Sequence, residues 1–145
     1  MKRSTLGAIL VVAVVVTALC LAWPRIHEVE TGRTPEYPDL KPRSYAAGVD
    51  RVAAAVKAAI SGLPRWRVVG AASGTRGADV QAEHVIPLVG FKEDVTVRLR
   101  RQGGQTTEVG VLSRSAWFRW DFGQNARNVR QLLGELDRQM EAAPK

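Results

Sequence analysis

The chain has 145 residues, with 21 lysines and arginines against 14 aspartates and glutamates, and its formal net charge is +7. This length excludes a second domain, because about 100 residues remain for one core once an N-terminal apolar segment and a linker are set aside. The single cysteine, Cys20, lies in the apolar segment, so the rest of the chain has no thiol for a disulfide, a metal site or nucleophilic catalysis.

An uncharged, apolar run from Leu6 to Trp23 follows Lys2 and Arg3. A run of this length is sufficient to cross a hydrocarbon core of about 30 Å. We therefore expect residues 1–23 to form a signal anchor, a single transmembrane helix that leaves the N-terminus in the cytoplasm and the domain outside it. A cleaved signal peptide and a lipoprotein signal remain alternatives.

Residues 24–42 contain four prolines, mixed charges and little apolar periodicity. This composition predicts an extended, semi-stiff linker. The folded domain then covers residues 43–145.

Apolar residues recur at three- and four-residue spacing over residues 49–63, which predicts an amphipathic helix that ends at Gly62 and Pro64. Two strands are predicted next, over residues 66–69 and 80–86, and a glycine-containing turn joins them.

The clearest strand follows Gly90, where apolar and polar residues alternate, and its partner covers residues 106–113. A loop of residues 102–104 gives the register in which the apolar side chains share one face. The pairs in this register are Val95 with Val111, Val97 with Val109, and Arg98 with Glu108. Asp94 and Arg114 are then diagonal neighbours on the other face.

A last helix is predicted from the capping-box spacing of Asp121 and Gln124 and from the apolar stripe that follows. The stripe consists of Phe122, Ala126, Val129, Leu133, Leu136 and Met140. The predicted order of the domain is α-β-β-β-β-α. The fold class is therefore α+β: an N-terminal transmembrane helix, then a small two-layer domain in which two helices cover one face of an antiparallel sheet of about four strands.

Two segments, GFKEDVTVR at 90–98 and SR…DFGQNARNVR within 113–130, carry a resemblance to a known family. From about Pro38 to Met140 the chain resembles the bacterial DUF1499 family, a domain of unknown function. The residues that fit its two motifs are Gly90, Phe91, Asp94, Val95 and Arg98 in the first, and Ser113, Arg114, Asp121, Gly123, Asn125 and Arg130 in the second. The resemblance implies an envelope-associated domain with no established activity.

The candidate site residues are Asp94, Arg114, Asp121 and Asn125, which the predicted fold brings toward the start of the last helix. A polar cluster beside a helix N-terminus is a natural anion site. The alternative, which we favour, is structural: Asp121 caps the helix, Arg114 pairs with Asp94, and Asn125 ties down the loop. A carboxylate at the helix N-terminus already occupies the position that an anion would take.

We expect no catalytic, metal-binding or cofactor-binding residue. Glu83 and His84 are adjacent in a predicted strand and so point to opposite faces, and His27 has no ligand-type residue near it. Ser113 and Ser115 have no histidine that the sequence places as a base. The chain is therefore predicted not to be an enzyme, and it has no recognised nucleic-acid motif.

An aromatic segment precedes the last helix and consists of Trp117, Phe118, Arg119 and Trp120. Its rings can cover the end of a thin core, or they can form a contact with a membrane or a protein partner, since indoles favour the head-group zone and arginine favours phosphate.

The sequence as a whole predicts a membrane-anchored, extracytoplasmic binding or structural module of the bacterial cell envelope. The expected partners are the cytoplasmic membrane, with contact to anionic lipid, and an unknown envelope protein, with no nucleic acid. The alternative is a domain that binds a lipid or a small apolar ligand between sheet and helices. A hydrolase built around His84 is less favoured.

Overall fold

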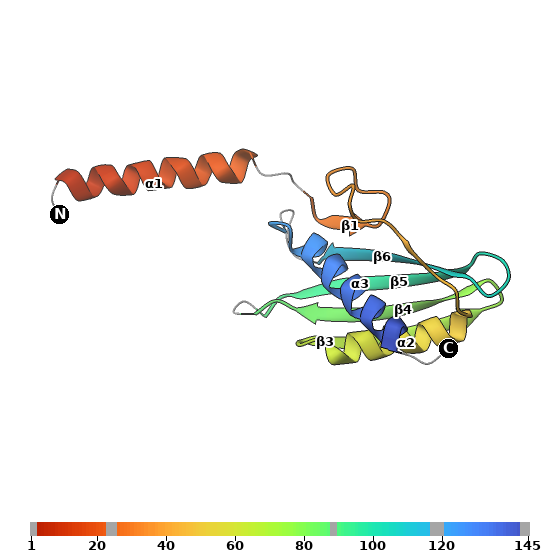
Figure 1. The fold of residues 1–145 in the computed structure, drawn as a ribbon. Coiled ribbons are helices and arrows are strands. Elements are labelled where there is room, and N and C mark those ends of the chain that lie inside the picture. Colours follow the sequence, from red (N-terminus) through yellow and green to blue (C-terminus); the bar gives the residue numbers. More distant parts are fainter. Residues whose placement is uncertain (1–2, 23–25, 88–89, 117–120, 143–145) are drawn as a thin grey trace.

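A computed structural model describes residues 3–22, 26–87, 90–116 and 121–142 (Figure 1). Its elements, in chain order, are α1 (Arg3–Ala22), β1 (Glu28–Glu30), β2 (Arg43–Tyr45), α2 (Val49–Gly62), β3 (Trp66–Gly74), β4 (Gly77–Val85), β5 (Lys92–Arg101), β6 (Thr107–Ser115) and α3 (Gln124–Ala142). The helices α2 and α3 lie on the same face of one antiparallel sheet, as the sequence predicts.

The core fills the space between the sheet and these two helices. The stripe predicted for α2 is buried, with Val52, Val56 and Ile60 fully inaccessible. The helix ends as expected: Leu63 closes it with a backbone hydrogen bond to the Ile60 carbonyl, and a proline follows. Valines and leucines of β4, β5 and β6 alternate inward against it, which confirms the amphipathic patterns of both kinds of element.

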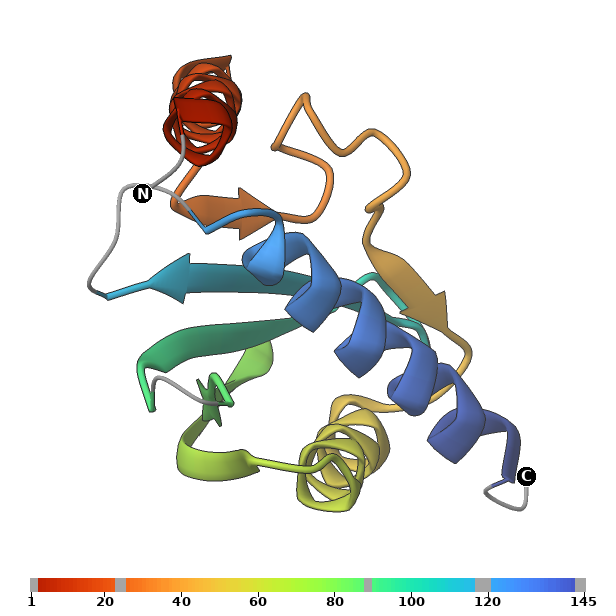
Figure 2. The same ribbon diagram turned by 90° about the vertical axis from the view of Figure 1, so that its left-hand side faces the viewer.

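The sheet has six strands rather than the expected four, in the order β1-β6-β5-β4-β3, with β2 also paired to β6. The two additional strands are three residues each and pair with opposite ends of β6. Figure 2 shows the chain looping outward between β1 and β2 and returning to this edge of the sheet at β2.

The segment predicted as a linker therefore packs on the domain over part of its length. Val29 of β1 is 0% exposed, and Leu40 is also buried. The backbone N–H of Gly32 donates to the Leu40 carbonyl, and Arg130 of α3 makes an ion pair with Asp39. A three-residue strand carries too short an alternating pattern to be recognised in the sequence.

The predicted register of β5 and β6 is wrong by two residues. Val97 lies opposite Val111, and Leu99 lies opposite Val109. The connection is longer than expected, because the N–H of Gln102 donates to the carbonyl of Thr106 across a loop that contains two glycines with positive φ. A shift of two residues keeps every side chain on its predicted face, so the amphipathic pattern alone does not detect it.

The predicted fold class is also wrong in its transmembrane segment. Residues 3–22 are helical, as expected. Among the described residues, however, no helix combines the length and the apolar character needed to span a bilayer.

Candidate functional site

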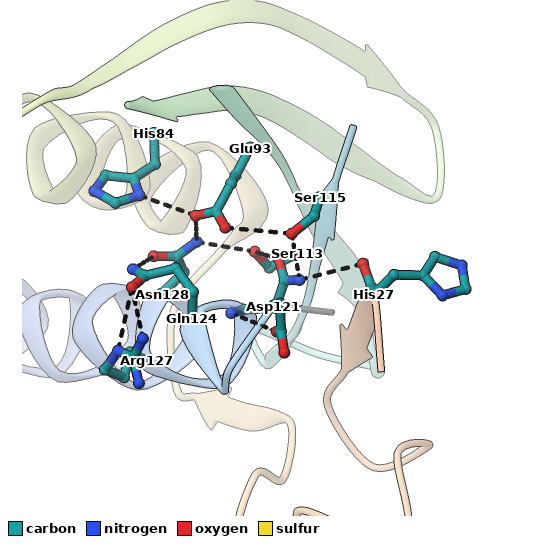
Figure 3. A network of polar contacts seen from close by, with 10 residues as sticks. His27, His84, Glu93, Ser113, Ser115, Asp121, Gln124, Arg127 and Asn128 are labelled. Carbon is teal, nitrogen blue, oxygen red and sulfur yellow. Dashed lines mark hydrogen bonds and ion pairs between the residues drawn. The ribbon is translucent and has the colours of Figure 1, made fainter. Parts of the chain in front are cut away.

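Six polar side chains, five of them buried and one partly buried, lie between the inner face of the sheet and the first turns of α3 (Figure 3). We call them the polar network: His84, Glu93, Ser113, Ser115, Asn125 and Asn128. The strand register brings these side chains together, because His84 of β4 lies opposite Glu93 of β5, and Glu93 lies opposite Ser115 of β6. Asn125 and Asn128 stand about one turn apart on α3 and face these strands.

Glu93 is at the centre of the polar network and is 1% exposed. Its Oε2 atom lies 3.1 Å from Nδ1 of His84 and 2.5 Å from Nδ2 of Asn128. Its Oε1 atom accepts a hydrogen bond from the hydroxyl of Ser115 at 3.3 Å. A carboxyl group this deeply buried requires such partners, because burial without them costs several kcal/mol.

The two asparagines use both of their amide hydrogens. Asn128 Nδ2 donates to Glu93 and, at 3.2 Å, to the hydroxyl of Ser113. Asn125 Nδ2 donates to the hydroxyl of Ser115 at 2.9 Å and to the carbonyl of His27 at 3.2 Å. Ser113 in turn donates to Oδ1 of Asn125 at 2.7 Å. The donors of these side chains are thus directed at acceptors inside the network or, in one case, at the adjacent backbone carbonyl of His27.

Asp121 fixes the start of α3, as the sequence predicts. Its two carboxylate oxygens accept hydrogen bonds from the backbone N–H groups of Gly123, at 2.9 Å, and Asn125, at 2.8 Å. The predicted capping box is only half present, because the Gln124 side chain donates to Asn128 instead of turning back. Phe122 was predicted to lie on the apolar stripe, but it precedes the helix with a φ of 48° and is 52% exposed.

Within the described residues, the polar network does not contain the serine–histidine hydrogen bond of a serine hydrolase. An activated serine needs a hydrogen bond to the catalytic histidine. The hydroxyls of Ser113 and Ser115 instead donate to Asn125 and Glu93, and His84 contacts Glu93 through its Nδ1 atom. Across the described parts of the chain, no group of three or more His, Cys, Asp or Glu side chains can hold a metal ion.

Trp66 of β3 packs against His84 at one side of the polar network. Its ring centroid lies 5.2 Å from that of His84, with the two planes tilted by 34°. The indole ring of Trp66 therefore covers one side of the His84 ring.

The four predicted site residues do not form one cluster. Asp121 and Asn125 belong to the helix side of the sheet, whereas Asp94 and Arg114 lie directly opposite each other on β5 and β6 and face away from it. Arg114 makes its ion pair, at 2.7 Å, with Glu28 of β1. The alternation of a strand separates Asp94 from Glu93.

Asp94 and Arg114 line a hollow of about 350 Å³ on the face of the sheet that carries no helix, which we call the open face. The remaining lining residues are Val69, Gln81, Ala82, Val95, Thr96 and Leu112. The pairing of β3 with β4 has an irregularity between Val68 and Gly70. Val68 packs on the core, whereas Val69, which lies at this irregularity, is 48% exposed. Bulges of this kind commonly redirect a side chain at a binding site.

The aromatic segment of Trp117, Phe118, Arg119 and Trp120 lies outside the described residues. Its contact with a membrane or a partner stays a prediction.

Sequence reasoning missed Glu93 and Asn128, the two residues that join the sheet to α3. A signal for Glu93 exists, because it occupies an inward position two residues before Val95 in the alternating strand. A charged residue in an inward position, followed by asparagines on the inward side of the next helix, is a pattern that indicates a buried polar network.

The fold and site define a class: a small α+β domain with a buried polar network on one side of its sheet and an open face on the other. A family described as "Protein of unknown function (DUF1499)" matches residues 17–136, and the chain therefore belongs to the DUF1499 family. No curated protein matches the chain. Three residues of the motif that carried the resemblance, Ser113, Asp121 and Asn125, lie in the polar network or at the helix start beside it.

Proposed function

We propose that the domain is a non-catalytic binding module whose ligand occupies the hollow on the open face. The observation that carries the proposal is the composition of this hollow: an exposed apolar side chain, Val69, stands near the exposed carboxylate of Asp94. Ligand sites typically combine apolar surface with a few placed polar groups.

The charges around the hollow favour a cationic ligand. Arg114 is held by Glu28, which offsets its charge. Within the described residues, Asp94 has no ion-pair partner, so its carboxylate is available to bind a positive charge. Gln81 and Thr96 add hydrogen-bonding groups nearby. We therefore propose an ammonium or guanidinium group joined to an apolar part as the ligand chemistry.

The polar network supports a non-catalytic role. Its hydroxyl and amide donors already bind neighbouring side chains or, for Asn125, also the backbone carbonyl of His27. A ligand that bound there would have to break these hydrogen bonds, and their loss costs free energy. The space between the sheet and the helices is occupied by the apolar core, which does not favour a lipid site between the layers.

The test is a titration of the ¹⁵N-labelled protein with phenethylammonium, compared with phenylacetate, which has a similar ring but the opposite charge. We expect amide shifts in β5 and β6 around Asp94 and Leu112 with the cation only. Asp94→Asn should weaken binding of the cation about tenfold, since it removes one close charge contact. Asp50→Asn, a matched change in the exposed first turn of α2, should leave binding unchanged.

Shifts that map to α2 and α3, or equal binding by the Asp94→Asn variant, would contradict the proposal. Equal binding of the cation and the anion would do the same.

A further inference from the structure

The two edges of the sheet differ in how they are protected. On one side, β1 and β2 are three residues each and pair with opposite ends of β6, and Thr31 exchanges hydrogen bonds with the backbone of Val111 between them. On the other side, β3 is nine residues long and ends the strand order, with β4 as its partner (Figure 1). A long edge strand presents a row of backbone N–H and C=O groups to any strand that approaches it.

The exposed part of β3 has few of the features that protect sheet edges. Its residues from Val68 to Gly74 include no charged residue and no proline. The irregularity lies between Val68 and Gly70, and from Gly70 to Gly74 the pairing with β4 is continuous. The only charged residue of β3 is Arg67, and its guanidinium is bound to Glu83 of β4.

We propose that β3 pairs antiparallel with β3 of a second copy of this chain, so that the two sheets become one. A two-fold axis between antiparallel strands requires one residue to lie opposite itself, because neighbouring pairs alternate between two hydrogen-bonding types. Ala72 is the centre of the regular stretch and is placed at this axis. Gly70 then faces Gly74 of the other copy, and Ala71 faces Ser73.

A second copy of the chain is proposed as the partner because residues 70–74 of β3 are complementary to the same residues of another copy. The side chains of this stretch are small on both faces, so two backbones can approach to the spacing of adjacent strands, about 4.8 Å. Arg67 lies three residues before Gly70 and Arg76 lies two residues after Gly74, so no like charges face each other inside the paired stretch. The uncharged edge gives no preference for an acidic or basic foreign strand.

The net charge of +7 per copy opposes this association at long range. Salt screens that repulsion, whereas the backbone hydrogen bonds of the paired edges are little affected. Dimers should therefore form more strongly at physiological salt than at low salt.

The experiment is sedimentation velocity of the full chain over a range of micromolar concentrations at low and physiological salt. The test variant is Ala72→Lys, which sets two like charges opposite each other across the axis. We expect it to weaken dimerisation about tenfold or more. Ala58→Lys adds the same charge at an exposed position of α2 and should dimerise as the original chain does. Far-ultraviolet circular dichroism confirms that both variants are folded.

A mixture of Ala72→Lys and Ala72→Glu variants provides the decisive result. We expect the two variants to associate with each other more strongly than either associates with itself, because only the mixed pair places opposite charges across the axis. A chain that stays monomeric at every concentration and salt would overturn the proposal. Dimers that Ala72→Lys does not weaken would overturn it as well, since they would use another surface. Neither result depends on whether the hollow of the open face binds a ligand.

Discussion

Asn128 is the residue through which α3 holds the buried carboxyl group of Glu93. We predict that Asn128→Asp destabilises the domain by roughly 3 kcal/mol, because it removes two hydrogen-bond donors and places a second acidic group beside a buried one. Urea denaturation followed by tryptophan fluorescence measures the change.

The matched control for this prediction is Gln131→Glu, which makes the same amide-to-acid change at an exposed position of the same helix. Its effect should stay within about 0.5 kcal/mol. Similar losses for the two variants would show that added charge on α3, and not the network, causes the destabilisation.

Tyr45 joins β2 to the last turns of α3 through a hydroxyl that donates to Asp137 at 2.6 Å. Burial, and then this hydrogen bond, raise the pKa of Tyr45 above its usual value. Because the folded state holds the proton more tightly, the stabilisation is complete below the unfolded pKa of about 10 and is lost as the pH rises above it. Tyr45→Phe should cost about 1 kcal/mol near neutral pH.

The free-energy difference between the original chain and Tyr45→Phe should shrink as the pH rises past about 10. Denaturant unfolding of both proteins at neutral and alkaline pH measures it. A difference that stays constant across this range would show that the hydroxyl of Tyr45 is not held by Asp137 in solution.

At the scale of elements, the hairpin of β3 and β4 depends on close contact with β5. A Cβ atom placed on Gly77 would lie 2.0 Å from the backbone carbonyl oxygen of Leu99. The backbone of β5 cannot move without disturbing the sheet, so Gly77→Ala should destabilise the domain by about 1–3 kcal/mol. Gly74→Ala, across the same turn, meets nothing closer than 3.9 Å and should change stability little. Thermal unfolding distinguishes the two variants, and equal melting temperatures would contradict the prediction.

The elements that the sequence predicts well are those with long amphipathic patterns. The helices α2 and α3 and the strands β4, β5 and β6 each repeat an apolar period several times, and burial of that face determines the local structure. The ends of the helices and strands, which depend on hydrogen bonds and backbone conformation in the loops, were less predictable from the sequence. The loop between Gln102 and Thr106 fixes the register, and two successive positive-φ residues keep Phe122 out of the last helix.

The candidate site was predictable only in part because partners far apart in sequence depend on register. Asp121 was identified from its spacing to the helix, which is a local signal. The pairing of Glu93 with Asn128 requires the strand face, the register and the rotation of α3 all at once. For the same reason Asp94 and Arg114 were expected to be diagonal neighbours and lie directly opposite each other.

At the scale of the whole molecule, the segment before α2 divides into two parts with different roles. The helix α1 extends away from the sheet, whereas β1 pairs with β6 and buries Val29 completely (Figure 1). Burial of a side chain such as Val29 or Leu40 contributes about 1.5–3 kcal/mol each. Together these two contributions are a large fraction of a typical stability of about 5–15 kcal/mol.

Two truncations test this division. A chain of residues 26–145 should unfold at nearly the temperature of the full chain, because it keeps β1, β2 and the packed segment between them. A chain of residues 46–145 loses both apolar side chains and leaves the side of β6 that faces away from β5 without its partner strands. It should therefore unfold at a much lower temperature or fail to fold. Circular dichroism melting of the three chains measures both effects. If residues 46–145 melted with the full chain, the first forty-five residues would contribute nothing to the core, and the pairing of β1 and β2 with β6 would be incidental to the fold.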